Sequence, residues 1–230
     1  EDAFFITDFV VGIADGVGGW IDKGIDPALY ANKLMEGAKQ AVIETIRDST
    51  QPSYLIPYCS KSILRSAAEH AKNVVGSSTA CVIAIDNTAH RLDAINVGDS
   101  GFMYIRGSKK MFRTREQQHS FNYPYQLGTG GEQPEQGDTI TLNDIEAGDI
   151  VILGTDGLWD NVFDEEIIQM AIATPDPLLL AEKLAQKAHE HAMDPFILSP
   201  FAVSAQRQGL PFLGGKLDDT TVLVCKIVPI

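Results

Sequence analysis

The chain has 230 residues, 44% of them apolar, and a formal charge of −13 at pH 7. This length fits a single domain, residues 1–230, with a sizeable core. Because nucleic-acid binding depends on clustered Lys and Arg, the acidic charge argues against DNA or RNA as a partner. The sequence contains no run of about 18 apolar residues, so we expect no membrane span.

The first half of the chain predicts strands, then two helices, then more strands. Strands are expected at 4–6 and 9–14. Asp26-Pro27 is typical of a helix start, and apolar residues at helical spacing extend that helix to about residue 47. A second helix from about 53 to 74 is expected to lie antiparallel to it in one layer. An antiparallel meander of strands should follow near 77–86, 90–97, 101–106 and 109–114.

The second half begins with a polar stretch rich in Gln, Gly and Pro, residues 115–136, which predicts a long irregular connection beside a site. Helical patterns begin around Asp164 and Asp176-Pro177. Further strands are expected at 138–142, 149–155 and 220–228. Because strands and helices segregate in blocks, the fold class is α+β.

Three acidic motifs flank strand-like runs. Asp15 follows the apolar run 9–14, Asp156 follows the run 150–153, and Asp218 precedes the run 221–224. Carboxylates at sheet ends can converge, and oxygen ligands suit hard cations such as Mg²⁺ or Mn²⁺. Glycines beside Asp15 and Asp156 would let the backbone approach an ion closely. The pattern predicts a dinuclear metal centre.

Two more acidic motifs complete the set: Gly98-Asp99-Ser100 follows a strand-like run, and Glu1-Asp2 precedes another. A single Asp-Gly pair is best explained as a tight turn, and a Gly-Asp-Ser turn needs no metal. The order and the residues of all five motifs, however, resemble those of the protein phosphatase 2C family of metal-dependent Ser/Thr phosphatases over nearly the whole chain.

This resemblance implies two packed antiparallel β-sheets flanked by α-helices, a four-layer αββα sandwich with metals in a cleft at one end. It also implies hydrolysis of phosphoserine or phosphothreonine on phosphorylated protein substrates. In that family a water that bridges two Mg²⁺ or Mn²⁺ ions attacks phosphorus, and the paired ions lower the pKa of this water.

By the same resemblance, Asp15 would bridge the two ions and Gly16 would contribute its backbone carbonyl. Asp156 and Asp218 would complete the first metal site. These three carboxylates and Asp2 are therefore the predicted catalytic residues.

The second metal would be held by Glu1 through water, while Asp2 would orient the nucleophile. Asp99 and Asp160 match positions that can hold a third, weaker ion together with Asp156.

Three further stretches resemble the mitochondrial branch of the family: 116–122, 188–195 and 198–202. The resemblance places the protein in the mitochondrial matrix. A chain that begins Glu1-Asp2 without Met is expected to be a processed fragment that lacks any targeting peptide. His119, in the polar connection, is a candidate substrate contact or proton carrier, although a structural hydrogen bond is the simpler role.

The chain also departs from the family pattern. Val17 stands where many members have His, Gly101 follows Gly-Asp-Ser where Arg is common, and the family's phosphate-binding Arg would precede Glu1. These departures keep two alternatives open: a catalytically weak regulatory module that binds phosphorylated proteins, and a phosphatase for small metabolites. The oligomeric state is left open.

Two competing motifs are weaker. Cys59 and Arg65 have the spacing of a cysteine phosphatase loop, but no glycine lies between them. The stretch 209–216 is one residue too long for a nucleotide-binding loop. The unpaired spacing of Cys59, Cys81 and Cys225 favours a reducing compartment.

Overall fold

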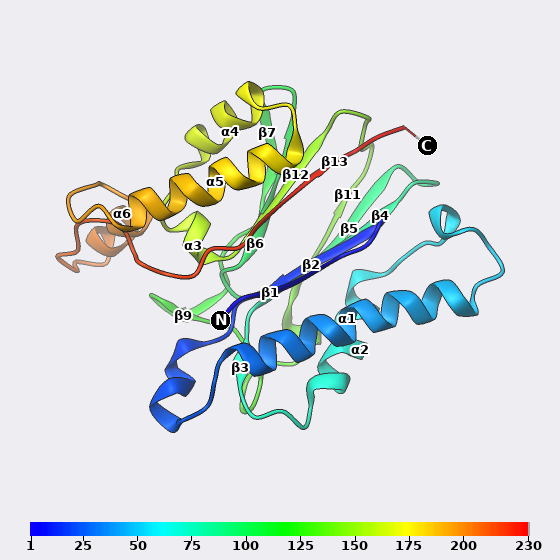
Figure 1. The fold of residues 1–230 in the computed structure, drawn as a ribbon, viewed down its shortest axis with the longest axis horizontal. Helices are drawn as coiled ribbons and strands as arrows, with labels where there is room; N and C mark the ends of the chain where they lie inside the picture. The colour runs from blue at the N-terminus through cyan, green and yellow to red at the C-terminus, as the bar shows by residue number, and fades with distance from the viewer. Residues whose placement is uncertain (230) are drawn as a thin grey trace.

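Residues 1–229 are described by a computed structural model in which two sheets pack between two layers of helices (Figure 1). The first sheet comprises β1 (Ala3–Ile6), β2 (Val10–Ala14), β4 (Ala80–Asp86), β5 (Arg91–Val97) and β11 (Asp138–Leu142), in the order β1-β2-β4-β5-β11. The second comprises β13 (Val222–Lys226), β12 (Ile150–Gly154), β6 (Gly101–Arg106) and β7 (Lys109–Arg113), in the order β13-β12-β6-β7. All neighbouring strands are antiparallel. The expected α+β sandwich is confirmed.

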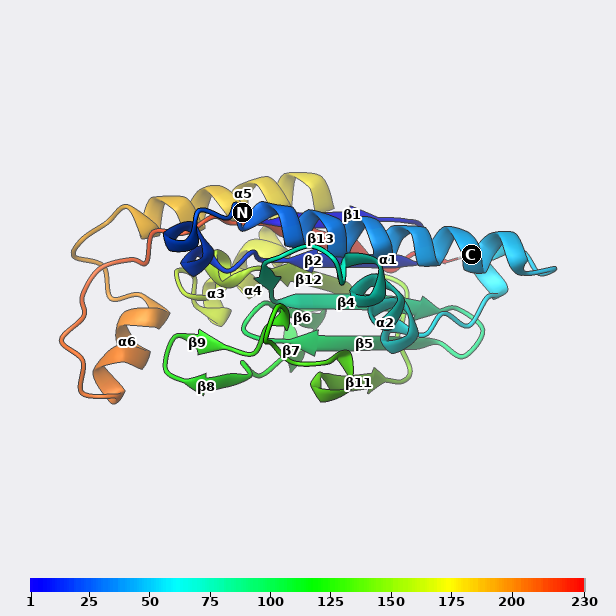
Figure 2. The same cartoon turned by 90° about the horizontal axis from the view of Figure 1, so that it is seen from below.

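Helices cover the outer face of each sheet. The first sheet is covered by α1 (Ala28–Asp48) and α2 (Ser60–Ala71), and the second by α4 (Asp164–Ala173) and α5 (Pro177–Ala192) (Figure 1). The short helices α3 (Asp156–Trp159) and α6 (Pro200–Arg207) lie at one end of the sandwich (Figure 2). The 3₁₀ helices η1 (Gly18–Lys23), η2 (Ser53–Leu55) and η3 (Pro134–Gln136) lie in connections. None of the helices within residues 1–229 has the length and apolarity needed to cross a membrane.

Alternation along the strands builds three apolar layers. In β2, Val10 and Ala14 pack toward α1 and α2, whereas Val11 and Ile13 pack between the two sheets. In the second sheet, Ile152 of β12 faces the layer under α4 and α5. Full burial of one such side chain stabilises the fold by about 1.5–3 kcal/mol, so these apolar layers stabilise the packing of the two sheets against each other and against the helices.

The second helix is shorter than the predicted span of 53–74. Pro57 would lie in the interior of that longer helix, where it would remove a backbone hydrogen bond and clash with the preceding turn. The chain instead forms η2, and α2 begins only at Ser60. The two helices do run antiparallel, since Asp48 at the end of α1 and Cys59 before α2 line one pocket, and Gly37 contacts His70.

The predicted meander from 77 to 114 is wrong at one step, the pairing of β5 with β6. β5 pairs with β4 and β11, and β6 pairs with β7 and β12, so the chain changes sheets between β5 and β6. Gly98 makes this crossover with a φ of 97°, a conformation that favours glycine. Asp99 is thereby placed at the end of both sheets.

The connection 115–136 is more ordered than predicted. It contains a hairpin of β8 (Gln118–Ser120) and β9 (Tyr123–Pro124), and β10 (Leu127–Gly128), which pairs with β3 (Ser77–Ser78). The hairpin lies at the same end of the molecule as α3 and α6 (Figure 2). The sequence pattern also missed η1, α3 and α6, which are too short to show a helical period.

Candidate metal centre

Three of the predicted carboxylates converge where β2, β12 and β13 end or begin. Asp15 follows β2, Asp156 opens α3 directly after β12, and Asp218 lies before β13, the strand that pairs with β12. Burial raises the pKa of Asp15 well above its usual value, and the neighbouring charges of Asp156, Asp2 and Asp218 raise it further. These carboxylates therefore share one desolvated space.

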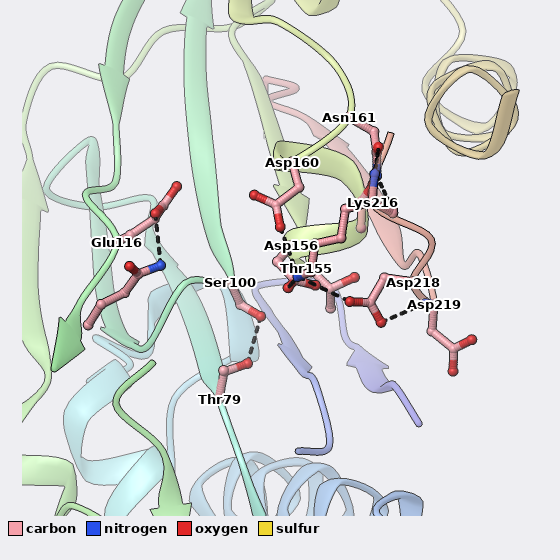
Figure 3. Close-up of polar contacts among 12 residues, drawn as sticks. Thr79, Ser100, Glu116, Thr155, Asp156, Asp160, Asn161, Lys216, Asp218 and Asp219 are labelled. Atoms are coloured by element: carbon pink, nitrogen blue, oxygen red, sulfur yellow. Dashed lines mark hydrogen bonds and ion pairs between the residues drawn. The ribbon is translucent and has the colours of Figure 1, made fainter. Parts of the chain in front are cut away.

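The backbone of Asp15 is held by Thr79, the residue between β3 and β4. Its N–H donates to the Thr79 hydroxyl at 3.2 Å, and its carbonyl accepts from the Thr79 N–H at 2.9 Å. The Thr79 hydroxyl in turn lies 2.7 Å from that of Ser100, beside Asp99 (Figure 3). The first and fourth acidic motifs are thus joined through Thr79.

Glu1 and Asp2 reach the same space from the start of β1. The Thr155 hydroxyl, fully buried, donates to Asp2 Oδ2 at 2.9 Å, and burial raises the pKa of Asp2. A Cβ added to Gly18 would lie 3.1 Å from Glu1 Oε2, and one added to Gly16 would lie 2.9 Å from the Glu1 carbonyl oxygen. Glycine at both positions lets Glu1 approach the centre.

Three carboxylate oxygens at this end are buried and have no hydrogen-bond partner among residues 1–229: Asp2 Oδ1, Asp99 Oδ1 and Asp156 Oδ1. A buried anionic oxygen without a partner is costly, so each is expected to have one in the working protein. Hard divalent cations prefer such oxygens. The donor chemistry of the cluster therefore fits Mg²⁺ or Mn²⁺.

Lys216, which the sequence analysis considered only as the end of a rejected nucleotide-binding loop, lies among the carboxylates. Its ammonium contacts Asp156, lies 2.9 Å from Asp160 Oδ2 and lies 3.2 Å from Asp218 Oδ2 (Figure 3). Burial would lower the pKa of Lys216, but the charges of Asp160 and Asp156 outweigh it and raise the pKa. Within residues 1–229, no three carboxylate, imidazole or thiolate side chains are grouped closely enough to hold a metal ion, and the Lys216 ammonium lies between Asp156 and Asp160.

Asp99 and Asp160 complete the acidic cluster. Burial raises the pKa of Asp99 to about 7, and Asp156 adds to this shift while Lys216 opposes it. Burial also raises the pKa of Asp160, again opposed by Lys216. Glu116, another buried carboxylate, has a raised pKa for the same reason, and Arg113 opposes that shift. The cluster holds more negative than positive charge.

His119 does not join this cluster. Its Nε2 lies 2.7 Å from Glu132 Oε1, and its ring packs on Tyr125 with centroids 4.4 Å apart. It lines a neighbouring groove of about 280 Å³ together with Trp20 and Lys23. Val17, directly after Asp15-Gly16, also lines this groove, which therefore adjoins the carboxylates.

The sequence analysis did not predict a site role for Lys216 or Asn161, and only Lys216 has a sequence pattern that could have indicated one. Lys216 and Asp218 are two residues apart in the irregular segment before β13, and in an extended chain this spacing puts side chains on one side. Asn161, fully buried after Asp160, shows no such pattern, although it binds the backbone of Lys216.

The chain matches the family model described as Stage II sporulation protein E (SpoIIE) over residues 7–228. It is 41% identical to "Probable protein phosphatase 2C 55" of Arabidopsis thaliana, over 97% of this chain and 47% of that protein. It is 37% identical to the human "Protein phosphatase PTC7 homolog", over 97% of this chain and 78% of that protein. It spans about half the length of two of its Arabidopsis relatives, 47% and 53%.

Solved structures show the same architecture. The photosystem II phosphatase PBCP is 31% identical, with a TM-score of 0.87 over 99% of this chain and 91% of that one. The catalytic domain of PstP, at 20% identity and a TM-score of 0.63 over 99% of this chain and 91% of that one, shares the fold. From the motifs, the sandwich and these relatives, the chain belongs to the protein phosphatase 2C (PPM) family.

Proposed function

We propose that this chain hydrolyses phosphoserine and phosphothreonine on proteins in a reaction that depends on Mg²⁺ or Mn²⁺. The observation that carries the proposal is the buried carboxylate cluster, with unpartnered oxygens on Asp2, Asp99 and Asp156. Membership of a family of protein phosphatases supports the reaction class. The PstP catalytic domain, which shares this fold, was solved with two manganese ions.

The residues proposed to hold the ions are those nearest the convergence of the strands. Asp15, the Gly16 carbonyl, Asp156 and Asp218 would hold one ion, and Asp15 and, through water, Glu1 would hold the other. When bound, such a pair lowers the pKa of water and stabilises charge on the phosphoryl oxygens.

Asp2 is proposed to orient the attacking water and take its proton. The Thr155 hydroxyl fixes Asp2 Oδ2, which leaves Oδ1 buried and without a partner among residues 1–229. Oδ1 is therefore the proposed proton acceptor.

The groove beside Val17 is proposed to hold the substrate residues that flank the phosphorylated one. Lys23 and His119 supply polar groups on its wall, and Trp20 and Tyr123 supply flat apolar surface. Glu132 fixes His119 through the 2.7 Å contact. A phosphopeptide has flanking residues that this groove could bind, which favours a protein substrate over a small metabolite.

Asp15→Asn tests the metal mechanism in a phosphopeptide assay with Mn²⁺, Mg²⁺ or EDTA. We expect EDTA to abolish hydrolysis and Asp15→Asn to slow it by about 10³-fold, or about 4 kcal/mol of barrier. Asp48→Asn, on an exposed residue at the end of α1, is the matched control and should retain full activity. Normal turnover by folded Asp15→Asn would remove the mechanism. Phosphopeptide binding without hydrolysis at saturating Mn²⁺ would favour the regulatory module instead.

His119→Ala tests the groove. We expect a higher KM for the phosphopeptide and an unchanged KM for p-nitrophenyl phosphate, because the smaller substrate does not reach His119. His189→Ala, on the exposed side of α5, is the matched control. Equal KM changes for both substrates would contradict a role in peptide recognition.

A mitochondrial matrix location is proposed from the resemblance of 116–122, 188–195 and 198–202 to that branch, and human, frog and fish PTC7 homologues are among the relatives. Imaging of the tagged full-length gene product beside a matrix marker tests it. Exclusion from mitochondria would refute it.

A further inference from the structure

The ammonium of Lys216 occupies a site made by three carboxylates. It contacts Asp156, lies 2.9 Å from Asp160 Oδ2 and lies 3.2 Å from Asp218 Oδ2. The ammonium donates hydrogen bonds to Asp156 Oδ2 and Asp160 Oδ2 and forms an ion pair with Asp218. Only 17% of the Lys216 side chain is exposed to solvent.

Hydrogen bonds to its backbone fix the position of Lys216 beside these carboxylates. Fully buried Asn161 donates to the Lys216 carbonyl at 2.9 Å and accepts from the Lys216 N–H at 2.9 Å. The ring of Phe201 lies 5.5 Å from the ammonium. Since Asn161 directly follows Asp160, the same turn supplies both a carboxylate for the ammonium and the anchor for the lysine backbone (Figure 3).

The position matters because Asp156 and Asp160, with Asp99, are the residues expected to hold a third, weaker ion. An ammonium at Asp156 Oδ2 and Asp160 Oδ2 and a divalent cation on the same oxygens would exclude one another through contact and charge. Asp156 Oδ1 is left without a partner in the described chain and stays available to the first ion. One carboxylate can therefore serve a metal and the lysine at once.

We propose that Lys216 is a built-in cation that takes the place of the third divalent ion, so that this centre binds two ions. The inference rests on the proposed metal centre and assigns Lys216 a role as a positioning residue for Asp156 and Asp160. Its positive charge is permanent, whereas a weakly bound ion would come and go with the metal concentration.

The test counts Mn²⁺ ions per chain by equilibrium dialysis followed by elemental analysis, over a range of free Mn²⁺ up to several millimolar. We expect two ions in the wild type and in Lys216→Arg, which keeps the charge. Lys216→Met should bind three, and the added ion should be lost in the double variant Lys216→Met/Asp160→Asn. Lys110→Met, which removes a surface ion pair with Asp164 at 2.6 Å, is the matched control and should bind two.

Lys216→Gln is a second neutral variant if Lys216→Met does not fold, and circular dichroism checks folding in every case. Two ions in a folded neutral variant, or three in the wild type, would overturn the inference while leaving the phosphatase intact. A folded wild type that binds no Mn²⁺ and hydrolyses nothing would instead overturn the proposed function, and the inference with it.

Discussion

Replacing Asn161 with Ala should destabilise both the fold and the proposed metal centre. Asn161 is fully buried and makes three hydrogen bonds: it donates to the Gly157 and Lys216 carbonyls and accepts from the Lys216 N–H, each at 2.9 Å. At about 1 kcal/mol per bond, their loss lowers the free energy of unfolding by about 3 kcal/mol. For a chain of this size that corresponds to a fall in Tm of about 6–12 °C.

The same substitution frees the segment that carries Asp218. Because groups that orient metal ligands typically contribute about 10–100-fold in affinity, we expect Asn161→Ala to weaken Mn²⁺ binding by that factor. Thermal denaturation in EDTA and titration calorimetry with Mn²⁺ measure the two effects separately.

Asn32→Ala is the matched control, since exposed Asn32 makes a single side-chain bond to the Ala28 carbonyl at 2.8 Å. Its free energy of unfolding should change by no more than about 0.5 kcal/mol. An unchanged Tm in Asn161→Ala would refute the stability calculation. A lower Tm with Mn²⁺ affinity within twofold of wild type would refute the link between Asn161 and the metal centre.

Three further predictions concern metal, pH and the competing cysteine motif. Mn²⁺ at about 100 times its Kd should stabilise the fold by about 2.7 kcal/mol and raise Tm by about 5–11 °C, and a scan that shows no rise would argue against a metal site. The pKa of Asp99 is raised from 3.8 to about 7 in the fold, so its contribution to stability is full below about pH 4 and is lost as pH rises through 7. Metal-free wild type should therefore lose more Tm between pH 5 and 7.5 than Asp99→Asn does, whereas parallel pH profiles would contradict this. Cys59→Ser should keep wild-type phosphatase activity, because Cys59 is exposed at the start of α2; a large loss would support a cysteine nucleophile.

The acidic motifs were predictable because each is local. Asp15, Asp156 and Asp218 adjoin strands whose apolar runs are evident in the sequence, and the strands end where the runs end. Pairing between distant strands was not predictable in this way. The chain changes sheets at Gly98 because β5 pairs with β11 and β6 pairs with β12, both far along the chain. These long-range pairings produce no periodic residue pattern near residue 98.

The position of Lys216 in the site was also not predictable from the sequence. Its spacing from Asp218 is visible in the sequence, but a lysine beside carboxylates is usually part of a solvated surface. Only the turn that brings Asn161 against the segment before β13 buries the side chain. Such a position depends on tertiary contacts, so no reading of local residue patterns could have found it.

The order of the strands also affects when the protein can become active during its synthesis. The proposed centre takes Asp2 from the start of β1 and Asp218 from just before β13, and β13 pairs only with β12 among the described strands. A nascent chain whose last strand is still inside the ribosome can form most of the first sheet, but it lacks Asp218. Contacts between such distant segments also form late, since they close the longest loops. The proposed phosphatase activity would then appear only after β13 has docked, so a partly made chain would lack it.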